Sequence, residues 1–163
     1  MIIGIAGVSR SGKTTLAISL KEKLGNAEII SLDDYPAKIE NFKYIKDVID
    51  WEHPSSLDFV KIIDVVREAA TKNEIIIVEG IFLFHHETLK SLIDKFIYLD
   101  LEKEDFLKRK LHDNRWGHIP NWYREHIWQS HLLFGVKPVG VEAFEINANS
   151  GFSFSELQDY LEK

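Results

Sequence analysis

The chain has 163 residues, of which 45% are hydrophobic and 28% charged, a balance that favours one globular domain with a full core. Its net charge of −6 gives no general electrostatic support for nucleic acid as a partner, and no apolar run is long enough to span a membrane. The absence of cysteine excludes disulfides, cysteine zinc sites and thiol catalysis, and it fits a cytoplasmic location.

The first predicted element is a buried strand. Residues 1–6 are apolar and run directly into a glycine-containing loop, which favours a core strand over a signal peptide. A helix is expected over 15–24, because apolar residues recur along it and Gly25 provides a natural C-cap.

Between this strand and this helix lies a phosphate-binding loop. Residues 7–14 match the pattern G-x-x-x-x-G-K-[ST] at every defined position. The glycines let successive N–H groups point at phosphate oxygens, Lys13 can reach the β- and γ-phosphates, and the Thr14 hydroxyl can ligate Mg²⁺. We therefore predict a nucleotide site formed by Gly7, Ser9, Arg10, Ser11, Gly12, Lys13, Thr14 and Thr15.

The rest of the chain alternates strands and helices. Strands are expected at 28–32, 75–78, 96–99 and 143–146, and helices from Ser55 or Ser56 to about 71 and at 87–94, 103–112, 122–134 and 155–161. Val60 is expected among the core residues of the second helix, whereas 37–54 show no clear periodicity. The alternation predicts a parallel sheet with helices on both faces and ligands at the carboxyl ends of its strands.

Acidic side chains follow two of these strands. Asp33 and Asp34 come after the second strand, where one of them could act as general base towards a substrate hydroxyl; the alternative is simple turn chemistry in Asp-Asp-Tyr-Pro. Glu79 ends the run of 75–78 and could hold Mg²⁺, the alternative being a solvated strand end.

A basic cluster falls within 103–118 of this acidic chain: Lys103, Lys108, Arg109, Lys110, His112, Arg115 and His118. It predicts a lid at about 103–120 that excludes water and supplies transition-state charge through Arg109 or Arg115. The alternative is the solvated face of a helix, because acidic residues are interleaved at spacings that suit ion pairs.

Tryptophans concentrate around the polar loops. Trp51 precedes the polar stretch Glu52-His53-Pro54, and Trp116 lies in the basic segment. Flat rings beside a polar loop suit stacking on a nucleobase or a similar ring, with core packing as the alternative.

Several segments together resemble one family, the uridine kinase and nicotinamide riboside kinase group of P-loop kinases. Besides the phosphate loop, residues 31–35 resemble S-Q-D-D-F of nicotinamide riboside kinases, and 51–54 with Asp58 resemble the F-D-H-P pattern of uridine kinases. Residues 77–84 resemble the E-G segment of the family, and 122–128 resemble the stretch Y-F-x-x-H-V-W of the nicotinamide riboside branch.

The resemblance implies a single P-loop NTPase domain over 1–163, with a five-stranded parallel sheet and a short lid. It also implies ATP- and Mg²⁺-dependent phosphorylation of a riboside 5′-hydroxyl. Asp33 becomes the expected base, Thr14 and Glu79 the Mg²⁺ ligands, and Glu52 the contact to the ribose hydroxyls. Trp51 and Trp116 would flank the base ring, and Asp34 and Tyr35 complete the expected substrate-binding residues.

Two other functions stay open at this point. The acceptor could be a non-nucleoside metabolite such as pantothenate, or the chain could be a nucleotide-binding regulator without phosphotransfer. Residues 147–151, after the last strand, are expected near the adenine only by position.

Overall fold

The computed structural model describes residues 1–113, 117 and 119–163. A central sheet of five parallel strands has the order β2-β5-β1-β6-β7. Its strands are β1 (Ile2–Gly7), β2 (Ala27–Ser31), β5 (Ile75–Glu79), β6 (Lys95–Asp100) and β7 (Phe144–Asn147). Because β1 lies between β5 and β6, the phosphate loop leaves the sheet at its centre. The predicted parallel sheet is confirmed.

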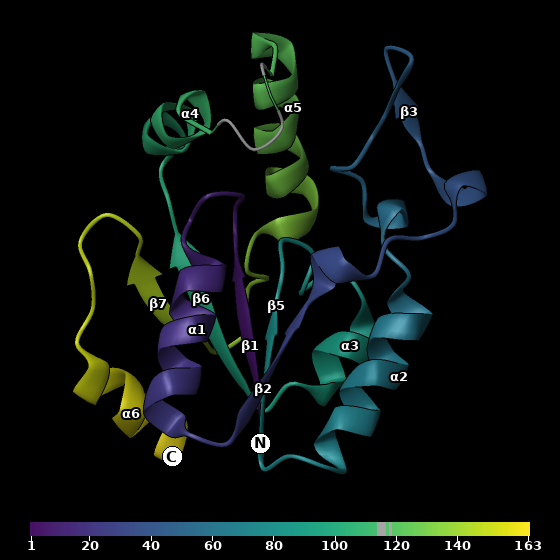
Figure 1. Ribbon diagram of the computed structural model, residues 1–163. Coiled ribbons are helices and arrows are strands. Elements are labelled where there is room, and N and C mark those ends of the chain that lie inside the picture. Colours follow the sequence, from purple (N-terminus) through teal and green to yellow (C-terminus); the bar gives the residue numbers. More distant parts are fainter. Residues whose placement is uncertain (114–116, 118) are drawn as a thin grey trace.

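Helices cover both faces of the sheet (Figure 1). On one face, α1 (Lys13–Leu24) and α6 (Phe154–Glu162) pack against the strands through side chains such as Leu20 and Leu157. On the other face, α2 (Phe59–Ala70) and α3 (Glu87–Leu92) bury side chains such as Ile62 and Leu89. Two apolar cores therefore enclose the sheet and hold its strands rigidly in register.

A third group of elements stands above the carboxyl ends of the strands (Figure 1). It comprises α4 (Lys103–Leu111), α5 (Asn121–Ser130) with the π-helical turn His131–Gly135, and the hairpin of β3 (Tyr44–Ile45) and β4 (Val48–Ile49). Short 3-10 turns occupy Leu32–Asp34, Ile39–Asn41 and Pro54–Ser56. In the described part of the chain, no helix combines the length and apolarity needed to cross a bilayer.

The start of α2 corrects the expected helix boundary. Neither Ser55 nor Ser56 caps it; Asp58 does, because its carboxylate accepts a hydrogen bond of 3.0 Å from the backbone N–H of Lys61. Pro54–Ser56 instead form a separate 3-10 turn. The buried face of the helix is formed by Ile62, Ile63, Val66 and Ala69. Val60 does not belong to this face, so the expectation that it is a core residue is wrong, and it is 71% exposed.

The β3–β4 hairpin was not expected from the sequence. Its two-residue turn, Lys46-Asp47, has φ angles of 46° and 65°, a conformation that glycine and asparagine adopt far more readily. The expected helix over 122–134 is also divided: α5 ends at Ser130, and the chain continues as the π-helical turn.

The Asp58 cap gives a direct test of the α2 boundary. Replacing Asp58 by Ala removes the side-chain acceptor for an orphan N–H, so the free energy of unfolding should fall by about 1 kcal/mol in a urea titration. The control is Val60→Ala on the exposed face of the same helix, which should change it by less than about 0.5 kcal/mol. Equal losses in both variants would contradict the assignment of the cap.

Candidate active site

The phosphate loop takes a conformation that its glycines make possible. Gly7 has a φ of 146°, and a Cβ on it would lie 2.6 Å from the carbonyl oxygen of Leu99. Gly12 has a φ of 105° and stands at the N-cap of α1, where its carbonyl accepts the first helical bond from Leu16 at 2.9 Å. Arg10 is also in the left-handed region, with a φ of 67°. The loop therefore curls over the N-terminus of α1, where anions bind.

Lys13 is held over this loop. It is the first residue of α1, its side chain is buried, and its Nζ donates to the carbonyl oxygen of Val8 at 3.1 Å. The ammonium group is thereby placed next to the loop that would cradle phosphate oxygens. Such a placement lowers the entropic cost of binding an anion, because the long side chain is already ordered.

A cavity of about 1290 Å³ opens above the carboxyl ends of the strands. The phosphate loop and the start of α1 contribute Ser9, Arg10 and residues 12–15 to its wall. Glu79 is the last residue of β5, and Asp33, Trp51 and Glu52 come from segments that follow other strands. Two basic side chains of α4, Arg109 and Lys110, also line it. Residues predicted separately from the donor motif and from the acceptor motifs thus share one cavity.

Some predicted residues do not line this cavity. Gly7 and Ser11 belong to the base of the phosphate loop, where Ser11 is buried. Asp34 is exposed and Tyr35 packs against the core, so of the segment 33–35 only Asp33 reaches the cavity wall. Arg115 and Trp116 lie outside the described residues, so their expected roles remain predictions.

Glu79 and Thr14 form a polar pair at the end of β5. Glu79 is only 4% exposed, and its Oε1 accepts hydrogen bonds from the Thr14 hydroxyl at 3.0 Å and the Ser31 hydroxyl at 2.8 Å. A carboxylate and a hydroxyl oxygen beside a phosphate loop are the hard ligands that Mg²⁺ prefers. These residues therefore fit the predicted metal role.

Glu52 is the most perturbed acid of the cavity. Burial among the cavity walls raises the pKa of this carboxyl to about 7. The neighbouring carboxylates of Asp33 and Asp50 raise the pKa further, while Lys110 and His126 oppose the shift. A side chain with this pKa changes its charge near neutral pH, which is common for groups in functional sites.

Arg109 of α4 connects two segments around the cavity. The Arg109 guanidinium donates to the carbonyl oxygens of Arg10 at 3.0 Å and Ala148 at 2.8 Å, and to the Asn149 side chain at 2.7 Å. It therefore joins the phosphate loop to the segment after β7. Arg109 thus lines the cavity and also ties two of its walls together.

Lys110 is a cation that the sequence analysis did not single out. It is only 5% exposed, and its Nζ lies 3.3 Å from the Asp113 carboxylate and 3.5 Å from the Ser9 hydroxyl of the phosphate loop. The available signal was its spacing four residues after Phe106, which is fully buried on the same face of α4. Lys110, rather than the exposed Lys108, therefore faces the cavity.

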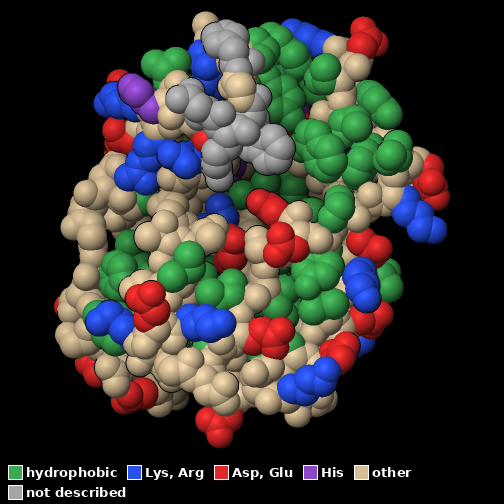
Figure 2. Space-filling view, in the orientation of Figure 1, with side chains coloured by type: hydrophobic (Ala, Val, Ile, Leu, Met, Phe, Trp, Pro, Cys, Tyr) green, Lys and Arg blue, Asp and Glu red, His purple; other side chains and the backbone are tan. Residues whose placement is uncertain are grey.

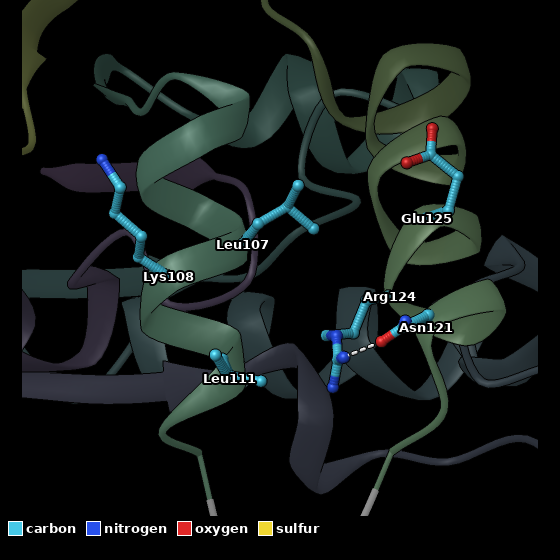
Figure 3. A pocket seen from close by; sticks show the side chains of 6 residues that line it. All are labelled: Leu107, Lys108, Leu111, Asn121, Arg124 and Glu125. Carbon is cyan, nitrogen blue, oxygen red and sulfur yellow. Dashed lines mark hydrogen bonds between the residues drawn. The ribbon is translucent and has the colours of Figure 1, made fainter.

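A smaller hollow of about 380 Å³ lies between α4 and α5, away from the phosphate loop (Figure 3). Its side chains are Leu107, Lys108, Leu111, Asn121, Arg124 and Glu125. The Arg124 guanidinium is already engaged by the Asn121 side chain and the Ile119 carbonyl. This smaller hollow contains none of the strand-end carboxylates, so we place the candidate active site in the larger cavity.

Comparisons with known proteins agree with this geometry. The chain is 27% identical to nicotinamide riboside kinase 1 of Homo sapiens over 152 residues, covering 82% of this chain and 75% of that protein. It is 31% identical to uridine kinase of Borrelia duttonii over 134 residues, covering 68% of this chain and 65% of that protein. No protein-family model matches the chain.

Among solved structures, a sugar kinase from a Janibacter species superposes with a TM-score of 0.69 at 19% identity, covering 99% of this chain and 94% of that one. This likeness confirms the P-loop kinase fold. The sequence comparisons confirm the expected resemblance to riboside kinases, and they support a phosphotransferase with an alcohol group as acceptor.

The raised pKa of Glu52 predicts that the free energy of unfolding depends on pH. Folding binds the Glu52 proton more tightly, so its contribution to stability is full below about pH 4.5 and is lost as the pH rises through 7. Replacing Glu52 by Gln removes the buried charge, and should therefore stabilise the protein at pH 8 by about 1–3 kcal/mol and have little effect near pH 4.5. Thermal unfolding across this pH range measures the difference.

The control is Glu40→Gln in the exposed turn Ile39–Asn41, which changes the net charge equally without altering the cavity. A stability difference for Glu52→Gln that does not vary with pH would contradict the buried-charge explanation.

Proposed function

We propose that the chain is a kinase that transfers the γ-phosphate of ATP to the 5′-hydroxyl of a riboside, of the nicotinamide riboside or uridine type. One observation carries the proposal: the phosphate loop, Asp33 and the Trp51-Glu52 pair line the same cavity. Its volume of about 1290 Å³ exceeds the roughly 300–1,000 Å³ of a typical single-ligand pocket, which suits two substrates. The similarity to riboside kinases supports the same substrate class.

The donor half of the site is the phosphate loop. Its backbone N–H groups and the Lys13 ammonium would bind the β- and γ-phosphates of ATP, with the positive end of α1 behind them. Thr14 and Glu79 would hold Mg²⁺, which when bound neutralises charge on these phosphates. Residues 147–151 remain the proposed location of the adenine, and Arg109 connects two of them, Ala148 and Asn149, to the phosphate loop.

The acceptor half supplies the base. Asp33 lies in the short turn after β2 and is exposed towards the cavity, so its carboxylate can take the proton of the acceptor hydroxyl. The hydroxyl oxygen then forms a bond to the γ-phosphorus, the bond to the bridging oxygen breaks, and ADP leaves. Glu52 would bind the ribose hydroxyls, and the half-exposed Trp51 ring would stack on the base.

Cations on α4 would compensate the charge of the transferring phosphoryl group. Lys110 approaches the phosphate loop through Ser9, and Arg109 does so through Arg10, so both lie on the donor side. The proposed lid at 103–120 includes these two residues, and Arg115 and Trp116 would complete it. Because phosphoryl transfer depends mainly on positioning and charge, these cations are expected to contribute to kcat.

The role of Asp33 is tested by a matched pair of variants. Asp33→Asn removes the base without changing the shape of the side chain, so kcat should fall by about 10²–10⁴-fold while ATP binding is retained. Asp34→Asn alters the adjacent carboxylate, which does not reach the cavity wall, and should lower kcat by less than about 10-fold. ADP release under saturating substrates measures kcat for both variants. Unchanged turnover in Asp33→Asn would contradict the assignment of Asp33 as the base.

The substrate class is tested by ADP release with a panel of acceptors. Nicotinamide riboside, uridine and other ribosides should stimulate turnover of the wild type, whereas pantothenate and water should not. If pantothenate were the one acceptor of the panel to stimulate turnover, the proposed acceptor would be a non-nucleoside metabolite and not a riboside. Tight ATP binding in calorimetry without turnover of any acceptor would instead identify a nucleotide-binding regulator.

A further inference from the structure

The loop that carries Trp51 and Glu52 has no regular secondary structure of its own. It connects β4 to the 3-10 turn Pro54–Ser56, over residues 50–53. Backbone N–H and C=O groups in such a segment need partners from outside the helix and strand ladders. In this loop, which we call the acceptor loop, the N–H groups of Asp50 and His53 donate to backbone carbonyls, whereas Trp51 and Glu52 are bonded by buried side chains.

Three backbone groups of Trp51 and Glu52 are fixed in this way. The Glu52 N–H donates to Asp50 Oδ1 at 3.1 Å, and the Trp51 carbonyl accepts from the Ser56 hydroxyl at 3.0 Å. The Glu52 carbonyl accepts a hydrogen bond from the Ser130 hydroxyl of α5. Asp50, Ser56 and Ser130 are all buried, which makes these contacts costly to lose.

His126 extends this arrangement to α5. Its Nε2 lies 2.7 Å from Asp50 Oδ1, the same oxygen that accepts the Glu52 N–H. His126 precedes Ser130 by four residues, so both side chains lie on one face of α5 and contact the acceptor loop together. Asp50, through His126, and Glu52, through Ser130, therefore join the acceptor loop to α5.

We propose that Asp50 and His126 are positioning residues that orient Trp51 and Glu52 for acceptor binding; the inference rests on the proposed riboside kinase function. Neither residue lines the cavity, and their side-chain hydrogen bonds in the described structure connect α5 and the acceptor loop. The donor side is held by different contacts, from Lys13, Arg109 and Lys110. Loss of the pair thus affects the acceptor and leaves ATP binding intact.

The main test is the effect of His126→Ala on the two substrates. Removing a hydrogen bond to a buried carboxylate frees the acceptor loop, so the KM for the riboside should rise about 10-fold or more. The KM for ATP and kcat at saturating riboside should stay within about 2-fold. His126→Gln should restore most of the affinity, because its amide nitrogen can donate to Asp50 in place of Nε2.

The matched control is Gln129→Ala on the exposed face of α5. It removes a surface hydrogen bond to Glu125 and does not touch the acceptor loop, so both KM values should be unchanged. A riboside KM that is unaffected in His126→Ala, or that rises together with the KM for ATP, overturns the proposal.

Two further measurements keep the test independent of folding defects and of the proposed function. Asp50→Asn retains the side-chain shape but accepts more weakly, so the riboside KM should still rise while the KM for ATP does not. Hydrogen exchange should become at least about 10-fold faster at the Glu52 amide in His126→Ala, with the amides of α1 unchanged. Unaltered exchange at Glu52 would overturn the proposal, whereas an inactive wild type with faster exchange in the variant would contradict only the riboside kinase assignment.

Discussion

The close approach of Gly7 to the carbonyl oxygen of Leu99 determines where the phosphate loop leaves the sheet. A side chain at Gly7 would place its Cβ 2.6 Å from this oxygen, and the φ of 146° is one that other residues rarely adopt. With glycine there, the chain turns directly above the central strand. Because β1 lies between β5 and β6, the loop emerges beside Glu79 and one strand away from Asp33. The rest of the site depends on this turn.

That position concentrates opposite charges in a chain whose net charge is −6. Asp33, Glu52 and Glu79 share the cavity with the cations Lys13, Arg109 and Lys110. In the proposed reaction the cations would bind the nucleotide, and the carboxylates would serve the metal ion and the acceptor hydroxyl, so each set has its own role. Burial, with a smaller contribution from Asp33 and Asp50, raises the pKa of Glu52 to about 7, so keeping this carboxylate ionised in the cavity costs folding free energy. At pH values above 7, the ionised Glu52 therefore lowers the free energy of unfolding.

The sequence predicts the elements that depend on local chemistry. The β-branched run 75–78 and the phosphate loop identify β5, β1 and the ligand-binding edge of the sheet. The predicted start of α2 was wrong. Serine and aspartate are both good N-caps, and the 3-10 turn Pro54–Ser56 leaves Asp58 as the residue that caps the helix. Lys110 was predicted only as a member of the basic cluster, because residues 108–110 are all basic and the packing of Phe106 decides which of them faces the cavity. The roles of Arg115 and Trp116 stay predictions.

The two halves of the site differ in how the sequence encodes them. The donor loop is built from backbone angles at Gly7, Arg10 and Gly12, so eight consecutive residues contain nearly all of its information. The acceptor loop is held by contacts across 76 residues, from His126 to Asp50, and across 78 residues, from Ser130 to Glu52. A local motif therefore identifies the nucleotide side and leaves the acceptor open. Because these long-range contacts do not involve the phosphate loop, we expect substitutions at this face of α5 to affect the acceptor side and to leave the donor side unchanged.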